Sequence, residues 1–465
     1  MKIYRSNGFF LRKRLTHHQK SLLPDVMARK NWLTLPSLMR ILILNTSDNM
    51  GGAAIAARRL LHALHYTGHE VRMLVRDKTT DDPLVSAVDA NRWAKVIDRG
   101  RIFVANGFSR DKMWLTDAGF YGLKVTDHPL FKWADVIHLH WVNQGFLSLA
   151  EIGRILRSGK KIVWTMHDMW PVTGICHHAV DCVKFHSPSN EYGGGCHHCE
   201  QLCLPSGRDV SYSVFRQKAQ LYGKTKITFV ACSRWLADQA RKSALTQGHS
   251  VTDIPNPIDT DLFAPNIAQQ PSSNSPLHST LYPLSSKEST LSSNRKRILF
   301  ASANVSDERK GIQYLVRACE QLSDLREQVE LVVIGGKSSG VERMFDGWTV
   351  RVLPYATEER DMASLNASVD VFVTPSLQEN LPNTIMEAMA CGTTCVGFNV
   401  GGIPEMIDHL SNGYVARLRD TADLANGLRT ALDNSDLWGQ AARQKVLANY
   451  SLTSIAARYS ALYSK

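Results

Sequence analysis

The run Arg40-Ile41-Leu42-Ile43-Leu44-Asn45 is apolar at every inner position, as expected of a strand buried in a parallel β-sheet. Residues 53–66 follow with apolar side chains at helical spacing, and Gly68 ends that helix before a second strand at 71–75. Strands that alternate with helical stretches predict a parallel sheet with helices on both faces. Further strands are predicted at 136–139, 161–165 and 227–230.

The same pattern begins again after an interruption at 266–296. That stretch is rich in Ser, Pro, Asn and Gln without periodicity, so we expect a flexible linker. The sequence therefore predicts an α/β protein with two doubly wound, Rossmann-like domains, 39–265 and 297–440, that face each other across a cleft. A C-terminal helix within 441–465 is expected to pack back on the first domain. Strands of the second domain are predicted at 298–301, 331–334, 350–353 and 371–373.

The overall composition is that of a globular protein. The chain has 465 residues, of which 44% are hydrophobic and 21% are charged, which excludes a mostly disordered or fibrous chain. No apolar run approaches the roughly 18 residues that a membrane-spanning helix needs. Without an export signal, the nine cysteines indicate a reducing compartment, so we expect a cytoplasmic protein.

The positive charge is concentrated near the start of the sequence. Residues 1–38 contain eight Lys and Arg against one Asp, so most of the net charge of +11 lies there. We expect this extension to be a poorly ordered leader or the product of an upstream start codon, because Met39 directly precedes the first strand. A basic arm that contacts anionic lipid, with peripheral membrane association, is the alternative. The remaining chain is too weakly basic to indicate a nucleic-acid partner.

The clearest motif lies at 375–392, after the strand at 371–373. A loop carries Glu379, a helix is predicted to begin near Pro382, and Gly392 supplies its left-handed cap. Glu387 lies about one turn into that helix, so both carboxylates can face one ligand. Carboxylates suit a sugar because each accepts hydrogen bonds from neighbouring hydroxyls, and the free N–H groups at the helix start favour an anion.

These residues resemble the E-x7-E motif of the retaining, nucleotide-sugar-dependent glycosyltransferases of family 4, which have the GT-B fold. The resemblance covers 39–465 apart from the linker. It implies that Glu379 contacts the transferred sugar and that Glu387 contacts the nucleotide ribose. The resemblance also implies donor-binding positions at Asn380, Leu381 and Gly335.

In each predicted domain, the loop after the first strand is similar to a loop of that family. Lys310 matches the family's pyrophosphate-binding lysine, and a cation there would neutralise the diphosphate leaving group. The family commonly has an arginine six residues earlier, where this chain has Asn304, so Arg309 is its predicted replacement. Gly51 and Gly52, at the start of the first helix, let the backbone approach a phosphate or an acceptor closely.

His167 follows the strand at 161–165 and matches the family's active-site histidine. A neutral imidazole there can bond a sugar hydroxyl or a backbone carbonyl. The alternative is a structural histidine, which is the commoner role of a single histidine. His138 and His140, at the end of another strand, are predicted either to line the cleft or to be packed in the core.

A cysteine-rich insertion at 176–203 follows the histidine motif. Cys176, Cys182, Cys196 and Cys199 have the spacing C-x5-C-x13-C-x2-C, and the last pair can present two thiolates to tetrahedral zinc from one tight loop. A structural zinc is therefore one prediction; free thiols and disulfides are the alternatives. A similar insertion in colanic-acid glycosyltransferases implies a role in exopolysaccharide or lipopolysaccharide assembly.

The predicted function is a hexosyltransferase-type glycosyltransferase that moves a sugar from a nucleotide diphosphate sugar to a glycan or lipid-linked acceptor. No cofactor is required for this chemistry. A nucleotide-sugar epimerase on the same fold is one alternative, and a nucleotide-sugar-binding protein without transfer activity is another. A nucleic-acid binder that uses the cysteine loop and the basic extension is disfavoured by the near-neutral body.

Overall fold

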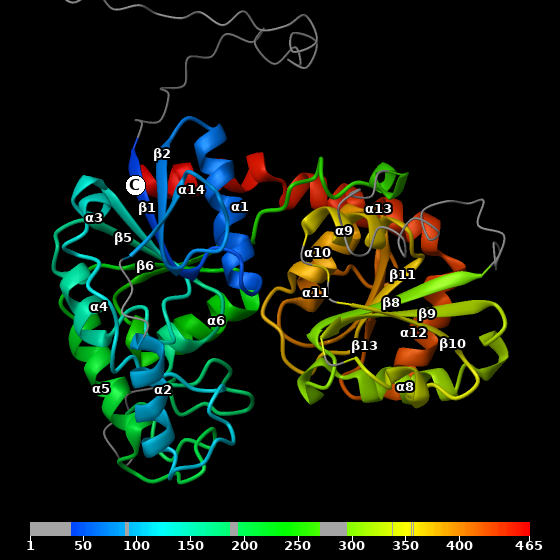
Figure 1. Cartoon of the computed structure of the whole chain (residues 1–465), viewed down its shortest axis with the longest axis horizontal. Helices are drawn as coiled ribbons and strands as arrows, with labels where there is room; N and C mark the ends of the chain where they lie inside the picture. Colours follow the sequence, from blue (N-terminus) through cyan, green and yellow to red (C-terminus); the bar gives the residue numbers. More distant parts are fainter. Residues whose placement is uncertain are drawn as a thin grey trace, which may run out of the picture. The chain divides into compact units, whose positions relative to one another are not determined.

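The computed structural model describes residues 39–88, 93–186, 194–269, 295–336, 338–354, 356 and 358–465. The predicted extension 1–38 and residues 270–294 of the predicted linker therefore lie outside the described residues. Two parallel β-sheets are present, one in residues 39–269 (the first half) and the other in residues 295–449 (the second half) (Figure 1).

The first sheet has seven strands in the order β3-β2-β1-β4-β5-β6-β7, and every neighbouring pair is parallel. All but the first residue of β1 are buried, because helices cover both faces of a sheet of this kind. The strands are β1 (Arg40–Ser47), β2 (Glu70–Asp77), β3 (Val85–Ala87), β4 (Val136–Leu139), β5 (Lys161–Met166), β6 (Thr228–Ala231) and β7 (Ser250–Asp253).

Side-chain caps define the starts of several helices in the first half. Ser148, Asp209 and Ser233 each accept a hydrogen bond from a backbone N–H in the first turn, which satisfies donors that the helix leaves open. The helices are α1 (Gly52–Tyr66), α2 (Ala94–Ala105), α3 (Pro129–Trp133), α4 (Leu149–Leu156), α5 (Val210–Tyr222) and α6 (Arg234–Lys242).

The second sheet has six parallel strands in the order β10-β9-β8-β11-β12-β13. Its strands are β8 (Lys296–Asn304), β9 (Val329–Gly336), β10 (Thr349–Leu353), β11 (Val371–Thr374), β12 (Thr394–Phe398) and β13 (Gly413–Ala416). Its helices are α8 (Ile312–Glu320), α9 (Glu359–Ala367), α10 (Asn383–Ala390), α11 (Ile403–Met406), α12 (Thr421–Asp433) and α13 (Ser435–Asn449). Two doubly wound α/β sheets confirm the predicted fold class.

Each sheet contains a point at which the strand order reverses. In the first sheet β1 lies between β2 and β4, and in the second β8 lies between β9 and β11. In doubly wound sheets, ligands bind outside the carboxyl ends of the strands at such points. We therefore expect a ligand to bind at the loops that follow β1, β8 and β11.

The chain returns to the first half after completing the second. Helix α14 (Leu452–Tyr463) packs against α1, and its Ile455, Ala456, Tyr459 and Tyr463 belong to the buried cluster that includes β1 and β2. Within this segment the structure has two helices, α13 and α14, and residue 441 lies inside α13 rather than between elements.

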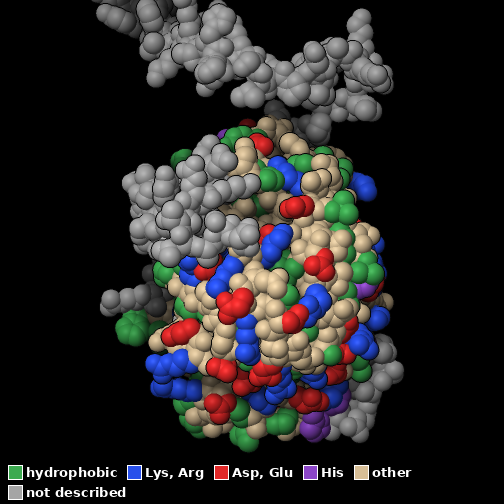
Figure 2. Space-filling model, turned by 90° about the vertical axis from the view of Figure 1, so that its right-hand side faces the viewer, with side chains coloured by type: hydrophobic (Ala, Val, Ile, Leu, Met, Phe, Trp, Pro, Cys, Tyr) green, Lys and Arg blue, Asp and Glu red, His purple; other side chains and the backbone are tan. Residues whose placement is uncertain are grey.

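The surface of the second half carries both signs of charge. Figure 2 shows Lys and Arg side chains interspersed with Asp and Glu over one face of the molecule. Several exposed cations of this half form ion pairs, such as Arg429 with Asp324 at 2.8 Å and Arg417 with Asp423 at 3.1 Å. In the part of the chain that the structure describes, no helix combines the length and the apolar character needed to cross a bilayer.

Candidate active site

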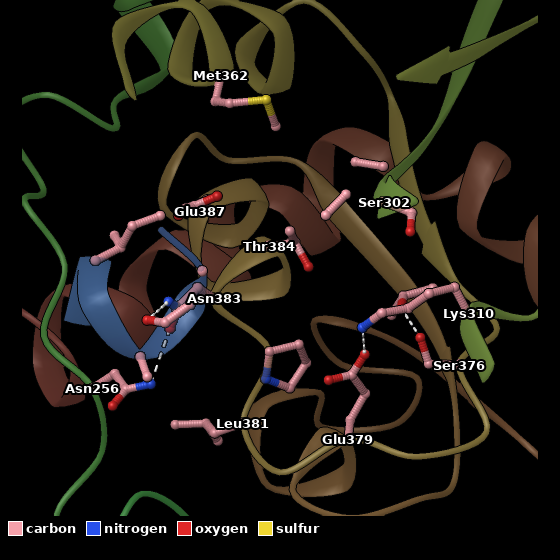
Figure 3. Close-up of a pocket in the computed structure, with 18 of the residues that line it drawn as sticks. Asn256, Ser302, Lys310, Met362, Ser376, Glu379, Leu381, Asn383, Thr384 and Glu387 are labelled. Atoms are coloured by element: carbon pink, nitrogen blue, oxygen red, sulfur yellow. Dashed lines mark hydrogen bonds and ion pairs between the residues drawn. The ribbon is translucent and has the colours of Figure 1, made fainter. Parts of the chain in front are cut away.

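A cavity of about 640 Å³ lies where the strand-end loops of the two sheets meet (Figure 3). Residues of both halves line it, so a ligand there would contact both sheets. Most of the sequence-predicted catalytic and donor-binding residues are in its wall, whereas Arg309 and Gly335 are not among the lining residues. The predicted residues that line it are Gly51, Gly52, His167, Lys310, Glu379, Asn380, Leu381 and Glu387.

Lys310 and Glu379 form an ion pair in the cavity wall, with 2.6 Å between Lys310 Nζ and Glu379 Oε1 (Figure 3). The two loops are joined by the backbone, because Leu377 N–H donates to the carbonyl of Arg309 at 2.8 Å. Gly311 permits this approach: its φ is +77°, and a Cβ there would lie 1.9 Å from the Pro375 carbonyl oxygen. The close packing of two loops therefore places the cation beside the first motif glutamate.

Arg309 points its guanidinium at its own loop rather than into the cavity. Its Nε lies 3.0 Å from Asp307 Oδ1 and its Nη2 lies 2.6 Å from Asp307 Oδ2. Hydrogen bonding to Asp307 raises the pKa of Arg309 further above its usual value. In this structure, therefore, the Arg309 guanidinium does not lie in the cavity, where the sequence predicted that it would contact the leaving diphosphate.

Glu387 is buried on α10, and its carboxylate bonds across to the first half. Arg59 of α1 donates to Glu387 Oε1 at 2.8 Å and to Glu359 Oε1 of α9 at 3.0 Å. Burial raises the pKa of Glu387, and the Arg59 guanidinium opposes that effect. Glu387 and Glu359 both line the cavity, so two carboxylates face the same part of it.

Asparagine side chains connect the loops of the two halves around the cavity. Asn256 Nδ2 donates to Asn383 Oδ1 at 3.0 Å, and Asn383 Nδ2 donates to the Gly52 carbonyl at 3.0 Å. Asn380 Nδ2 donates to the His167 carbonyl at 3.1 Å. Asn256, Asn383, Arg59 and Glu359 were not predicted. Asn383 had a local signal in its position at the start of a helix, and Asn256 had one in a stretch, 254–263, that resembles the family.

His167 lies in a row of three histidines at the carboxyl ends of β4 and β5. Its Nε2 lies 2.9 Å from His140 Nδ1. Burial lowers the pKa of His167 to about 4, so the imidazole is neutral at physiological pH. His138 and His140 are almost fully buried, which resolves their predicted alternatives in favour of packing. His167 alone of the three lines the cavity.

Gly335 has a local structural role at the end of β9. Its φ is +153°, and a Cβ there would lie 1.9 Å from the Ser302 carbonyl oxygen of β8. A side chain at this position would push β8 and β9 apart beside the cavity. Gly335 therefore shapes the strand ends without lining the site.

The four cysteines predicted to bind zinc are free thiols, and Cys176, Cys196 and Cys199 are buried. Burial raises the pKa of Cys196 to about 12, and a hydrogen bond to Cys176 is the main cause of a raised pKa at Cys199. Among the described residues, no group of three or more His, Cys, Asp or Glu side chains is arranged to hold a metal ion. The structural zinc at Cys176, Cys182, Cys196 and Cys199 stays a prediction.

The comparisons with known proteins point to one class. Anabaena HepE, solved in complex with UDP-glucose, superimposes with a TM-score of 0.56 at 16% identity, covering 92% of this chain and 99% of that one. That likeness identifies the fold as GT-B, the class of two-domain glycosyltransferases.

Sequence comparison identifies the family. Residues 50–262 match Glycosyltransferase Family 4 and residues 295–434 match Glycosyl transferases group 1, so the chain belongs to these glycosyltransferases.

Two curated relatives match over part of their length. The N-acetyl-alpha-D-glucosaminyl L-malate synthase of Bacillus anthracis is 34% identical over 116 residues, which are 24% of this chain and 30% of that protein. The N,N'-diacetylbacillosaminyl-diphospho-undecaprenol alpha-1,3-N-acetylgalactosaminyltransferase of Campylobacter jejuni is 27% identical over 154 residues, 31% of this chain and 40% of that protein. The matched region thus spans less than half of either relative.

Proposed function

We propose that this protein is a retaining glycosyltransferase that moves a sugar from a nucleotide diphosphate sugar to a glycan or lipid-linked acceptor. The observation that carries the proposal is the convergence of Lys310, Glu379 and Glu387 on one cavity between the two sheets. The cavity volume lies within the range of small-molecule sites. Family membership and the UDP-glucose complex of the Anabaena neighbour support this choice of donor.

Each group has a distinct part in the proposed transfer. The Lys310 ammonium stabilises the negative charge that develops on the diphosphate as the glycosidic bond breaks. Glu379 accepts hydrogen bonds from hydroxyls of the transferred sugar, and Glu387 accepts them from the ribose. The neutral His167 helps to position the sugar, because its carbonyl holds the cavity-lining side chain of Asn380. The acceptor attacks from the face that the diphosphate leaves, so configuration is retained without an enzyme nucleophile.

For the acceptor, we propose a saccharide or a lipid-linked saccharide of cell-surface polysaccharide assembly, reached at the cytoplasmic membrane face. The Campylobacter relative is named for a diphospho-undecaprenol-linked substrate, which supports a lipid-linked acceptor. Exposed apolar side chains in and around α2 support contact with a lipid surface, which buries such groups. These are Trp93, Val96, Val104, Phe108 and Trp114.

The test combines donor binding with turnover. A panel of nucleotide sugars is screened by thermal shift, and the stabilising donor is incubated with candidate acceptors. We expect Glu379→Ala to abolish transfer while the variant stays folded by circular dichroism. Product formed without any acceptor, with inverted stereochemistry in the donor sugar, would instead show an epimerase. Donor binding without turnover of any acceptor would indicate a binding protein.

A further inference from the structure

Arg59 connects the two halves from the middle of α1. Its side chain is 4% exposed, and it reaches out of the first half to two glutamates of the second. The guanidinium bonds Glu387 on α10 and Glu359 on α9, and its Cζ lies 5.0 Å from the centre of the Phe263 ring. A planar fork that bonds two carboxylates at once fixes their orientation, which a flexible ammonium does not do.

Arg59 itself is not among the residues that line the cavity, whereas Glu359, Glu387 and Phe263 are. It lies behind the wall and touches three of its members. Any effect of Arg59 on a ligand must therefore pass through those side chains. Arg59 takes Glu387 Oε1, which leaves Oε2 as the oxygen for a ligand.

The neighbouring carboxylates of Glu359 and Glu387 require a cation beside them. Glu359 and Glu387 share one guanidinium, and burial together with Glu359 raises the pKa of Glu387, while Arg59 lowers it. Cys391 caps the C-terminal end of α10, and burial raises the pKa of its thiol to well above the usual value, so it is neutral near Glu387. Without Arg59, a protonated Glu387 would lose part of its capacity to accept hydrogen bonds.

We propose that Arg59 is a positioning residue for the nucleotide: by bonding Glu387 and Glu359 together it holds the Glu387 carboxylate in a fixed orientation, so that a residue of the first half completes the ribose site of the second half. This inference rests on the proposed function, in which Glu387 binds ribose hydroxyls. It implies that nucleotide affinity depends on the contact of α1 with α9 and α10, and that the two halves bind a donor together.

The experiment separates ribose recognition from general stability. Dissociation constants are measured by calorimetry for the tightest binder among UDP, ADP and GDP and for its 2′,3′-dideoxy analogue. For Arg59→Met we expect affinity for the intact nucleotide to fall roughly 10- to 100-fold, the range for lost hydrogen bonds to a charged group. Affinity for the dideoxy analogue should stay within about twofold of wild type, because it lacks the hydroxyls that Glu387 binds.

A matched control is available one residue earlier. Arg58→Met removes the same charge from α1, and Arg58 has no hydrogen bond to either glutamate among the described contacts. This variant should bind both nucleotides as wild type does. Should Arg59→Met fail to fold, Arg59→Lys replaces it. An ammonium keeps the charge but lacks the planar fork that fixes the orientation of both carboxylates, so a smaller loss, again confined to the intact nucleotide, is expected.

Two outcomes would overturn the inference. An equal loss of affinity for both nucleotides, or no loss for either, would show that Arg59 does not act through recognition of the ribose hydroxyls. Absence of binding to every nucleotide by the wild-type protein would overturn the proposed function, and the inference would fall with it.

Discussion

At the scale of single residues, glycines bring the catalytic loop into place. Gly401 has a φ of +57°, and a Cβ at this position would lie 1.7 Å from the Glu379 carbonyl oxygen. The next residue donates its N–H to the Asn380 carbonyl at 2.7 Å. The loop that carries Glu379 therefore rests directly on the backbone of another loop, and no side chain fits between them.

We expect Gly401→Ala to lower the free energy of unfolding by about 2–4 kcal/mol, because the Glu379 carbonyl must move to admit the methyl group. Transfer activity should be lost as well, since Glu379 moves with its carbonyl. Gly340→Ala is the control: its φ is +80°, but a Cβ there would meet no atom within 4 Å. Left-handed strain alone costs about 1–2 kcal/mol. Equal urea midpoints for the two variants would contradict the steric explanation.

The residue scale also shows what a local motif can predict. Glu379, Glu387 and Lys310 were predicted because each lies in a recognisable motif that follows a strand, and all three line the cavity. Arg59 and Glu387 are 328 positions apart, and Asn256 and Asn383 are 127 apart. Such contacts arise only when two sheets meet, so no nearby pattern in the sequence could reveal them.

At the scale of elements, α14 completes the core of the first half. Tyr463 Oη lies 2.7 Å from the buried His138 Nδ1, and Tyr459 Oη lies 2.8 Å from Thr165 Oγ1. Polar groups buried under a sheet need such partners, because water cannot reach them. The helix therefore supplies both apolar contact and hydrogen bonds to β4 and β5.

Removal of one hydroxyl from α14 tests this role. We expect Tyr463→Phe to reduce the free energy of unfolding by about 1–3 kcal/mol, because it leaves a buried imidazole nitrogen without its partner. Tyr66→Phe is the control, since that side chain is 79% exposed on α1. Urea unfolding curves measure both variants. A Tyr463→Phe curve that overlays the wild type would show that the hydrogen bond contributes nothing to stability.

Elements also differ in how far their sequence predicts them. The strands β1 and β8 were predicted because burial on both faces produces a nearly continuous apolar run. β7, with sequence Ser-Val-Thr-Asp, is an edge strand that is partly exposed, and β3 has only three residues. Neither has an apolar run to detect. β12 was missed although it is buried, because Thr394 and Gly397 interrupt its apolar residues.

At the scale of the whole molecule, three buried histidines link stability to pH. Burial lowers the pKa of His138 to about 3 and that of His167 to about 4, and it lowers the pKa of His140 well below its usual value. The unfolded chain protonates its histidines near pH 6.5, whereas the folded protein keeps these three neutral. Below pH 6.5 the unfolded state therefore binds more protons, and stability falls as the pH falls.

We expect the free energy of unfolding to decline from pH 6.5 to pH 5, with a slope for each of these histidines that starts at about 0.7 kcal/mol per pH unit and approaches about 1.4 kcal/mol per pH unit near pH 5. The His138→Gln variant should have a lower free energy of unfolding at pH 7. Its free energy of unfolding should also depend less steeply on pH, by the contribution of one histidine. His65→Gln, at an exposed position of α1, should leave the slope unchanged. Denaturant titrations at several pH values provide the measurement. Parallel slopes for His138→Gln and wild type would refute the assignment.

The path of the chain determines when the core of the first half can be completed during synthesis. Helix α14 follows the entire second half in sequence, yet its tyrosines belong to the core of the first half. During synthesis, the first sheet emerges from the ribosome early and must wait, with part of its apolar surface uncovered, until α14 has been made. A nascent chain stalled before α14 should consequently recruit chaperones at the first sheet, even though every strand of that sheet has already been translated.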